Sequence, residues 1–350
     1  MGSNHASPAD LGSVVDRRRA VGKWLLALAA MVLVMVVLGG LTRLTGSGLS
    51  MVQWHPLSLL PPMSTSAWRQ VFADYQASPQ YRLLNEGMTL GDFKAIFWLE
   101  YIHRLWGRLI GFAFLAPFLW FVGRGAIGRA EAPRLALLFV LGGLQGVLGW
   151  LMVASGLAER PEVSHYRLMA HLMAALLIYG ALLWTAFHYL TDEAEEGGDG
   201  RGLSSRLIVL LGLICLTMAA GALTAGLHAG LVFNSFPLMD GHLLPAEAFD
   251  RRPIWLNFFE NLALVQFDHR VLAVLSWVTS WAVWLSSLTF RLTGAARRLL
   301  AAIPVLATLQ AGVGIATLLM VVPVALAAIH QTIAVLLFTA VLAALHEVRA

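Results

Sequence analysis

Charged residues and cysteine are scarce in this 350-residue chain. Asp, Glu, Lys and Arg make up 13% of it, whereas a soluble globular domain carries about 25%. The single cysteine, Cys215, excludes an intramolecular disulfide and any metal site built from several thiolates. Hydrophobic residues make up 58% and the net charge is only +4. The composition therefore excludes a cytosolic globular enzyme, a disordered protein and a nucleic-acid-binding protein, and it indicates a lipid membrane.

Long stretches without a charged side chain predict the membrane helices. A helix that crosses a bilayer needs about 20 apolar residues. Seven crossings are predicted from such stretches, two of them by splitting 299–346 at Pro323, since proline ends helices. The stretches are 24–42, 135–158, 168–191, the first part of 207–239, 271–290 and 299–346. The eighth crossing, at about 95–122, contains Glu100 and Arg104, and charges at such depth normally face a bundle interior or a cofactor.

Basic residues in the short connections predict the orientation. They gather before the first crossing, after the second and after the sixth, at Arg17, Arg18, Arg19, Lys23, Arg124, Arg129, Arg134, Arg291, Arg297 and Arg298. Because cytoplasmic loops carry the excess of Lys and Arg, both termini are predicted to be cytoplasmic. The long loops 43–94 and 227–261 then face outward. The first 20 residues lack the apolar core of a signal peptide, so the first crossing is expected to be retained.

An acidic, glycine-rich linker at 192–202 separates two halves that resemble each other. GGLTRLTGSGL from Gly39 matches GALTAGLHAGL from Gly221, IHRLWGRLIG from Ile102 matches DHRVLAVLSW from Asp268, and LQGVLGW from Leu144 matches LQAGVGI from Leu309. Chance similarity of apolar sequences is the alternative, but a His-Arg pair recurs as well. We therefore predict an all-α integral membrane protein whose eight transmembrane helices form two pseudo-symmetric four-helix bundles. Its parts are an N-terminal tail 1–20, a first half 21–191, a linker 192–205 and a second half 206–350.

Four histidines recur on the second and fourth predicted helix of each half: His103, His171, His269 and His330. These helices all enter from the outer face, and each histidine lies about six to nine residues inside its helix, or about 10–14 Å deep. Two imidazoles on facing helices suit axial ligation of one haem iron in each half. A core histidine without a ligand is the alternative for any one of them. Four further histidines, in or beside the outer loops, have no assigned role: His55, His165, His228 and His242.

Charged residues flank the histidines of the second helix in each half. Glu100 precedes His103 by three residues and shares its helix face, whereas Gln266 takes the equivalent position in the second half. A haem that only carries electrons needs no neighbouring acid, but oxidative chemistry uses one to take a proton or position a substrate. An ion pair with Arg104 is the alternative for this acid. Arg104 and Arg270 directly follow a histidine, and their guanidinium groups suit haem propionates.

The segments GGLTRLTGSGLSMVQWHPLSLLPP, FWLEYIHRLWGRLIG, FDHRVLAVL and AAIHQTIAVLL together resemble haem A synthases, and the resemblance covers about 21–345. With only Cys215, the chain is similar to the mitochondrial and alphaproteobacterial branch, which lacks the loop cysteine pairs of other members. The resemblance implies eight helices in an inner (cell) membrane. It also implies an oxidoreductase acting on a CH group, which converts the C8 methyl of haem O to the formyl group of haem A for terminal oxidases, with oxygen from water.

The same resemblance implies two haem sites. Haem b is the expected cofactor of the second half, haem O is the expected substrate of the first half, and Glu100 is the expected catalytic carboxylate. The implied haem b residues are His269, His330 and Arg270, and those for haem O are His103, His171 and Arg104. The implied partners are haem O, the farnesyltransferase that produces it and an unidentified electron acceptor, and a homo-oligomer is compatible with the resemblance.

Two other classes of membrane protein place histidines inside a bundle. A di-haem electron-transfer subunit of the cytochrome b type often carries its haems at different depths, whereas the four histidines here are predicted near one face. A transporter built from parallel repeats would use the histidines as proton relays and would bind no haem. A haem spectrum of the purified protein, together with an assay for haem A in the expressing cells, separates the three functions.

Overall fold

All regular secondary structure assigned in the part of the chain that the structure describes is helical, and turns and loops join the helices. The computed structural model describes residues 8–54, 60–158, 161–191 and 201–349, so His55 and residues 192–200 of the predicted linker lie outside the described residues. Eight helices have 25 residues or more: α1 (Pro8–Leu44), α4 (Leu90–Gly123), α5 (Ala132–Gly156), α6 (His165–Leu190), α7 (Arg201–Gly226), α9 (Leu262–Ser287), α10 (Gly294–Leu319) and α11 (Val324–Arg349).

Composition identifies seven of these long helices as membrane crossings: α1, α4, α5, α6, α7, α10 and α11. The chain is therefore a multi-pass membrane protein, as predicted. The remaining helix, α9, has 26 residues, which is as long as α10. It carries Asp268, His269 and Arg270 in succession, and composition alone does not identify it as a crossing.

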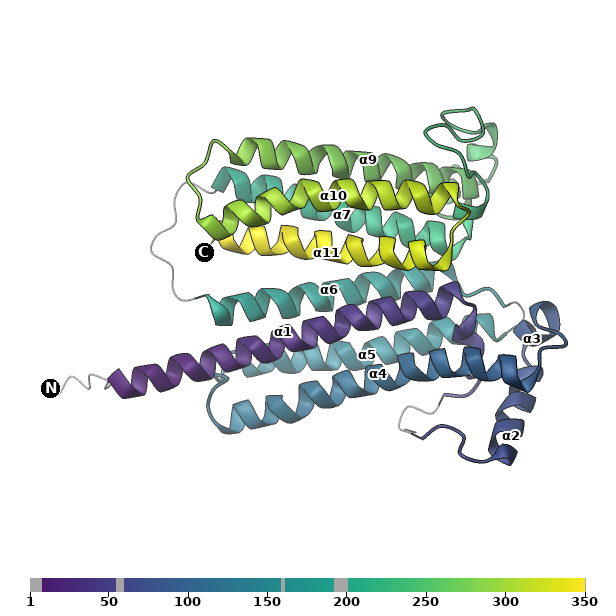
Figure 1. Cartoon of the computed structure of the whole chain (residues 1–350), viewed down its shortest axis with the longest axis horizontal. Coiled ribbons are helices and arrows are strands. Elements are labelled where there is room, and N and C mark those ends of the chain that lie inside the picture. The colour runs from purple at the N-terminus through teal and green to yellow at the C-terminus, as the bar shows by residue number, and fades with distance from the viewer. Residues whose placement is uncertain (1–7, 55–59, 159–160, 192–200, 350) are drawn as a thin grey trace.

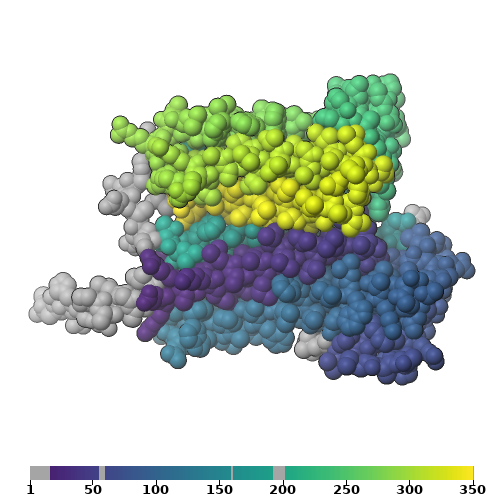
Figure 2. All heavy atoms as spheres, viewed as in Figure 1, coloured from purple at the N-terminus to yellow at the C-terminus, as the bar shows by residue number. Residues whose placement is uncertain are grey.

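The long helices pack as two groups of four (Figure 1). In the first group α1 contacts α4, α4 contacts α5, α5 contacts α6, and α6 returns to α1. In the second group α7, α9, α10 and α11 repeat this cyclic order. The groups meet where α6 contacts α7 and α11 and where α1 contacts α11. Figure 2 shows the second group, green to yellow, lying against the purple helix α1 of the first group.

The contact between the two groups is apolar and close. Leu176 of α6 and Val335 of α11 are buried in the same hydrophobic cluster. A Cβ built on Gly180 would lie 3.0 Å from the Cζ atom of Phe338, so this glycine allows α6 and α11 to approach. The hydroxyl groups of Tyr179 and Thr339 hydrogen-bond across the contact at 2.8 Å. Small residues and interhelical hydrogen bonds of this kind hold membrane helices together.

Short helices fill the two long connections at one end of the bundle (Figure 1). The first connection contains η1 (Ser47–Leu49), α2 (Thr65–Gln76) and α3 (Pro79–Leu84). The second contains η2 (Ala229–Leu231), η3 (Ala246–Phe249), η4 (Ile254–Leu256) and α8 (Asn257–Glu260). The described start of α1 and the end of α11 lie at the opposite end of the bundle.

Two helices begin earlier than the predicted tail and linker allowed. α1 begins at Pro8, so residues 8–20 are helical, and the guanidinium of Arg18 donates to the carbonyl of His188 at 3.0 Å. This bond ties the extended start of α1 to the end of α6. α7 begins inside the predicted linker, because Leu203 is fully buried in the hydrophobic core.

α4 begins at Leu90, five residues before the predicted start near Ala95. The hydroxyl of Thr89 accepts from the backbone N–H of Asp92, and the Asp92 carboxylate accepts from the backbone N–H of Thr89. This reciprocal capping box satisfies the free donors of the first helical turn. The prediction that each histidine lies six to nine residues inside its helix is therefore wrong for His103, although it is confirmed for the other three.

The predicted break at Pro323 is confirmed. α10 ends at Leu319 and α11 begins at Val324. Val321 and Val322 reverse the chain with φ angles of 60° and 57°. Left-handed backbone is unfavourable for β-branched residues, so this turn depends on the packing of the two helices it joins.

Candidate functional site

In the first group of helices, each predicted histidine lies against a glycine of the preceding helix. A Cβ built on Gly39 of α1 would lie 3.2 Å from the Nε2 atom of His103 on α4. A Cβ built on Gly149 of α5 would lie 3.3 Å from the Cε1 atom of His171 on α6. An alanine at either position would force a small displacement of the imidazole.

In the second group the same contacts are closer. A Cβ on Gly221 of α7 would lie 2.9 Å from the Cε1 atom of His269, and one on Gly314 of α10 would lie 2.6 Å from the Cε1 atom of His330. Real Cβ atoms do not approach neighbouring atoms this closely. Only glycine therefore leaves these two imidazoles where they are.

The four glycines occupy matching positions of the sequence repeat. Gly39 and Gly221 open the two aligned segments GGLTRLTGSGL and GALTAGLHAGL. Gly149 and Gly314 are the sixth residues of LQGVLGW and LQAGVGI. The repeat contained this signal, but the sequence alone did not show that each glycine faces an imidazole. In each group, a glycine on one long helix thus contacts a histidine on the next long helix, and this contact occurs twice.

His269 and His330 are spaced for a metal ion between them. Their ring centroids are 6.5 Å apart and their planes are perpendicular. A histidine nitrogen lies about 2.0–2.1 Å from a bound zinc ion. Two imidazoles on opposite sides of an iron at a similar bond length would have centroids about 6 Å apart. The separation of the two rings therefore fits one metal ion between them.

Hydrogen bonding at the ring nitrogens is consistent with this fit. The Nδ1 atom of His269 lies 3.1 Å from the carbonyl oxygen of Thr217. A proton on Nδ1 would donate to that carbonyl and leave Nε2 as the metal ligand, as second-shell bonds commonly arrange. Among the described residues, the buried Nδ1 atoms of His171 and His330 have no hydrogen-bond partner. The Nε2 atom of His330 lies 3.4 Å from the Gln310 amide nitrogen, so this ring has one protein partner and only its Nδ1 atom is unsatisfied.

His103 and His171 form the second predicted pair. They come from α4 and α6, which belong to the same group of helices. Both side chains are partly buried. In the described part of the chain, no three His, Cys, Asp or Glu side chains cluster to hold a metal ion. The described residues of each half therefore lack the three or four neighbouring ligands of a structural zinc site, and at most two histidines are available to bind one metal ion.

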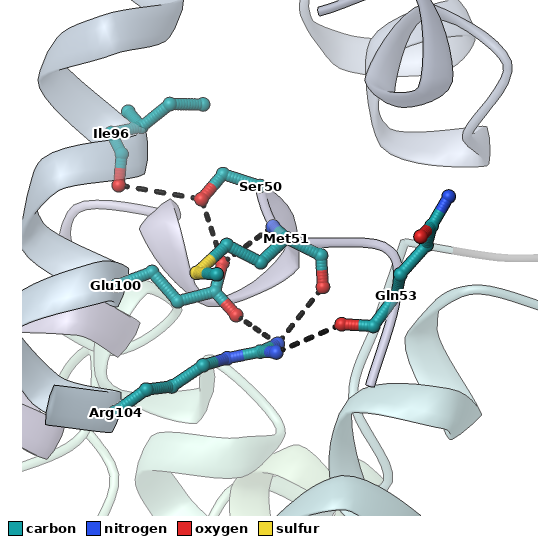
Figure 3. Close-up of polar contacts among 6 residues, drawn as sticks. All are labelled: Ser50, Met51, Gln53, Ile96, Glu100 and Arg104. Carbon is teal, nitrogen blue, oxygen red and sulfur yellow. Dashed lines mark hydrogen bonds and ion pairs between the residues drawn. The ribbon is translucent and has the colours of Figure 1, made fainter. Parts of the chain in front are cut away.

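Glu100 holds the first long connection to α4 (Figure 3). Its Oε2 atom accepts from the Ser50 hydroxyl at 2.6 Å and from the Met51 N–H at 2.8 Å. Its Oε1 atom pairs with the guanidinium of Arg104 at 2.5 Å. Arg104 also donates to the carbonyl of Met51 at 2.9 Å and to that of Gln53 at 3.1 Å. The ion pair considered from the sequence is thus present, and it is part of a clamp on residues 50–53.

Gln266 and Arg270 form the equivalent clamp in the second group. The guanidinium of Arg270 donates to the carbonyls of Phe233 and Ser235, each at 2.9 Å, and to the Gln266 Oε1 atom at 3.0 Å. The Gln266 amide donates to the carbonyl of Ala229 at 2.9 Å. Both clamps use an arginine and the residue four positions before it on the same helix. They differ in charge, because a carboxylate occupies the first and a neutral amide the second.

Backbone turns beside the two clamps also match. Gly46 precedes η1 with a φ of 66°, and His228 precedes η2 with a φ of 55°. These two residues are aligned in the repeat, so His228 occupies a turn where the first half has glycine.

His242 lies in a backbone turn, where its backbone N–H and carbonyl exchange hydrogen bonds with those of Met239. His165 begins α6 and packs against Gly226 at the end of α7.

An aromatic cluster supports the first connection. Trp68, Phe93 and Phe97 are buried in it, and Tyr75 is fully buried. The Tyr75 hydroxyl donates to the Oε1 atom of Gln80 at 3.0 Å, and burial raises the pKa of this phenol, which favours its neutral form. Gln80 in turn donates to the carbonyl of Gly46 at 2.7 Å. The cluster thus fixes the turn that leads into the Glu100 clamp.

Comparisons with known proteins place this architecture in a family. Residues 22–342 match the family described as "Cytochrome oxidase assembly protein". A protein of Granulibacter bethesdensis named "Heme A synthase" is 48% identical over 350 residues, covering 99% of this chain and 92% of the relative. Proteins of the same name from Paramagnetospirillum magneticum and Nitrosospira multiformis are 48% and 46% identical, over 94% and 95% of this chain and 94% and 96% of their own lengths. The chain therefore belongs to the cytochrome oxidase assembly protein family, as the resemblance of its motifs to haem A synthases predicted.

Proposed function

We propose that this protein is a haem A synthase, an oxidoreductase that converts the C8 methyl group of haem O to the formyl group of haem A, with water as the oxygen source. The names of its relatives support this function, since they are similar over nearly the whole chain. The observation that carries the proposal is the His269–His330 pair, whose ring centroids lie 6.5 Å apart, so that the two imidazoles would hold a haem iron between them. A redox enzyme that acts on a haem substrate needs a site of this kind.

The two groups of helices are two pseudo-symmetric halves in this proposal, and α9 is the eighth membrane crossing. The identical cyclic packing order supports the symmetry, as do the recurring glycine–histidine contacts. The described start of α1 and the end of α11 at one end of the bundle support an even number of crossings. With the basic short loops on the cytoplasmic side, both termini are cytoplasmic and both clamps face the outer side of the inner membrane.

The second half holds haem b as a resident cofactor, and the first half takes haem O as substrate. His269 and His330 would hold the haem b iron, and that haem would supply a one-electron redox centre. The closer glycine contacts support this division, since they fix His269 and His330 more tightly than His103 and His171. A substrate must enter and leave, so a looser pair suits it.

Glu100 distinguishes the substrate half from the cofactor half. Its carboxylate would accept a proton during oxidation of the methyl group, and the neutral Gln266 of the cofactor half has no such capacity. The clamp explains how the carboxylate is held, because three donors, from Ser50, Met51 and Arg104, fix its orientation. The two arginines are engaged by loop carbonyls, so each would contact a haem propionate only through its remaining N–H groups.

Expression in cells that produce haem O but no haem A tests the function. We expect haem A in the extract when the wild-type chain is expressed, identified by mass spectrometry. A His103→Ala variant present at the same level in the membrane should yield haem O only. Wild-type protein that is folded and binds haem, yet leaves haem O unchanged, would contradict the proposal and favour an electron-carrying subunit.

A further inference from the structure

A cavity of about 570 Å³ lies between the two groups of helices, beside the proposed haem b site. Its walls come from Met169 of α6, Leu216 and Leu223 of α7 and Val265 of α9. Phe258 and Phe259 of α8 line it as well. The volume lies within the range of small-molecule sites, about 300–1,000 Å³. Apart from one side chain, the lining is apolar.

That side chain is the carboxylate of Asp268. It is partly buried, and within the described ranges it has no hydrogen-bond or ion-pair partner. The matching residue of the first half is Ile102, which is 44% exposed on the side of α4. A carboxylate inside a membrane helix is costly and normally faces a polar partner. Since the protein supplies none here, a bound molecule with a polar head is the natural partner.

The cavity adjoins the proposed haem b ligands. Asp268 directly precedes His269 on α9. On the opposite wall Ala220 lines the cavity, and the next residue, Gly221, contacts the His269 imidazole. A ligand in the cavity would therefore contact α7 and α9 at the residues next to Gly221 and His269.

We propose that this cavity binds the ring of an isoprenoid benzoquinone, which serves as the electron acceptor of the proposed reaction. The inference rests on the proposed function. An isoprenoid quinone combines one polar ring with a long apolar tail, which matches a single carboxylate among apolar walls. The carboxylate accepts a hydrogen bond from a hydroxyl of the quinol. A phospholipid with an anionic headgroup fits less well, because its phosphate would be repelled by Asp268.

The electron balance agrees with a two-electron acceptor. Conversion of a methyl group to a formyl group with one water releases four electrons and four protons. Two hydrogens leave the methyl carbon, two leave the water, and the water oxygen becomes the carbonyl oxygen. Two quinones take up these four electrons and four protons and become two quinols, so the sum is R–CH3 + H2O + 2 quinone → R–CHO + 2 quinol.

Photolabelling of the purified full-length protein in lipid nanodiscs tests the site. The probe is a short-chain benzoquinone with an azido group, and labelled peptides are mapped by mass spectrometry. We expect labelling within 257–272 and 216–223, which excess unlabelled quinone suppresses at least tenfold and excess phosphatidylethanolamine does not. Equal suppression by the lipid would identify a lipid site and overturn the proposal, as would labelling elsewhere.

Two variants and a control make the test specific. Ala219→Phe fills the cavity from α7, and Asp268→Leu removes its polar group. Ala219→Phe should raise the dissociation constant of the short-chain quinol at least tenfold, and so should Asp268→Leu, which removes the acceptor for the quinol hydroxyl. Val209→Phe, on an exposed site of α7 outside the cavity, should leave the constant unchanged. The haem spectrum checks folding, and Ala219→Phe remains informative if Asp268→Leu does not fold.

The same preparations separate this inference from the proposed function. Conversion of haem O to haem A with an artificial one-electron acceptor, but without quinone labelling of the cavity, overturns the quinone site and leaves the function intact. Quinone labelling of the cavity in a protein that never produces haem A, with any acceptor, overturns the function instead.

Discussion

Gly314 of α10 lies directly against the imidazole of His330, so a Cβ at this position would be 2.6 Å from the His330 Cε1 atom. The same relationship joins Gly221 to His269 at 2.9 Å. Neither glycine contributes a chemical group to the site. In the proposed haem b site they leave room for two imidazoles, whose ring centroids are 6.5 Å apart.

Replacing Gly314 with alanine should displace His330 and reduce haem binding. Overpacking of a filled site costs about 1–3 kcal/mol, and in a helix this is partly offset by about 1 kcal/mol of better helix propensity. We therefore expect a folded protein with at least a several-fold lower haem content, measured by pyridine haemochrome per mole of protein. Gly312→Ala is the matched control on the same helix, because a Cβ there meets nothing within 4 Å. Equal haem content in both variants would show that the contact does not position the histidine.

A second prediction separates the proposed proton acceptor from the loop clamp at Glu100. Glu100→Gln keeps an acceptor for Arg104 but places an amide where Ser50 and Met51 now donate, at a cost of about 1–3 kcal/mol. Conversion of haem O should fall about a hundredfold or more, because general acid–base catalysis contributes at least that much. Haem content should stay near that of the wild type. Unchanged conversion by this variant removes the carboxylate from the chemistry and leaves it as a clamp.

Glu100→Ala should be the more damaging variant structurally. It leaves the guanidinium of Arg104, whose side chain is only 16% exposed, without its carboxylate. Breaking a buried pair on one side costs about 3–5 kcal/mol. We expect a lower melting temperature than that of Glu100→Gln in the same detergent. A higher melting temperature for Glu100→Ala than for Glu100→Gln would show that this ion pair does not stabilise the folded protein.

The Arg270 clamp predicts a local change in the second long connection. Arg270→Met removes the donors to the carbonyls of Phe233 and Ser235. Hydrogen–deuterium exchange of residues 229–237 should become at least tenfold faster, since local opening loses charge-assisted hydrogen bonds of about 1.5–3 kcal/mol each. Arg252→Met, an exposed arginine of the same connection, should leave exchange of this segment unchanged. Slow exchange in the Arg270 variant would mean that other contacts hold the loop.

The sequence was informative where a single chain segment contained the signal. Uncharged runs and Pro323 predicted the long helices and their last break, and the repeated His-Arg pairs identified His103 and His269. Composition alone does not identify α9 as a crossing, because its polar site residues lower its hydropathy. The charge of Glu100 suggested a role in chemistry and an ion pair, and the ion pair is observed.

Features that depend on distant parts of the chain were not predicted. The Glu100 clamp joins residues about fifty positions apart, and only the packing of η1 on α4 brings them together. The glycine–histidine contacts require the rotation of each helix about its axis, which periodicity in a uniformly apolar helix does not determine. The early start of α4 depended on a capping box at Thr89 that the apolar run did not include.

Haem extraction from four purified variants, each with one of the four histidines replaced by alanine, tests the central claim most directly. That claim is that each half holds one porphyrin between two imidazoles. We expect His269→Ala and His330→Ala to lose haem b, while His103→Ala and His171→Ala keep haem b and lose haem O. Retention of a full, spectrally unchanged haem b by either His269→Ala or His330→Ala would contradict the account.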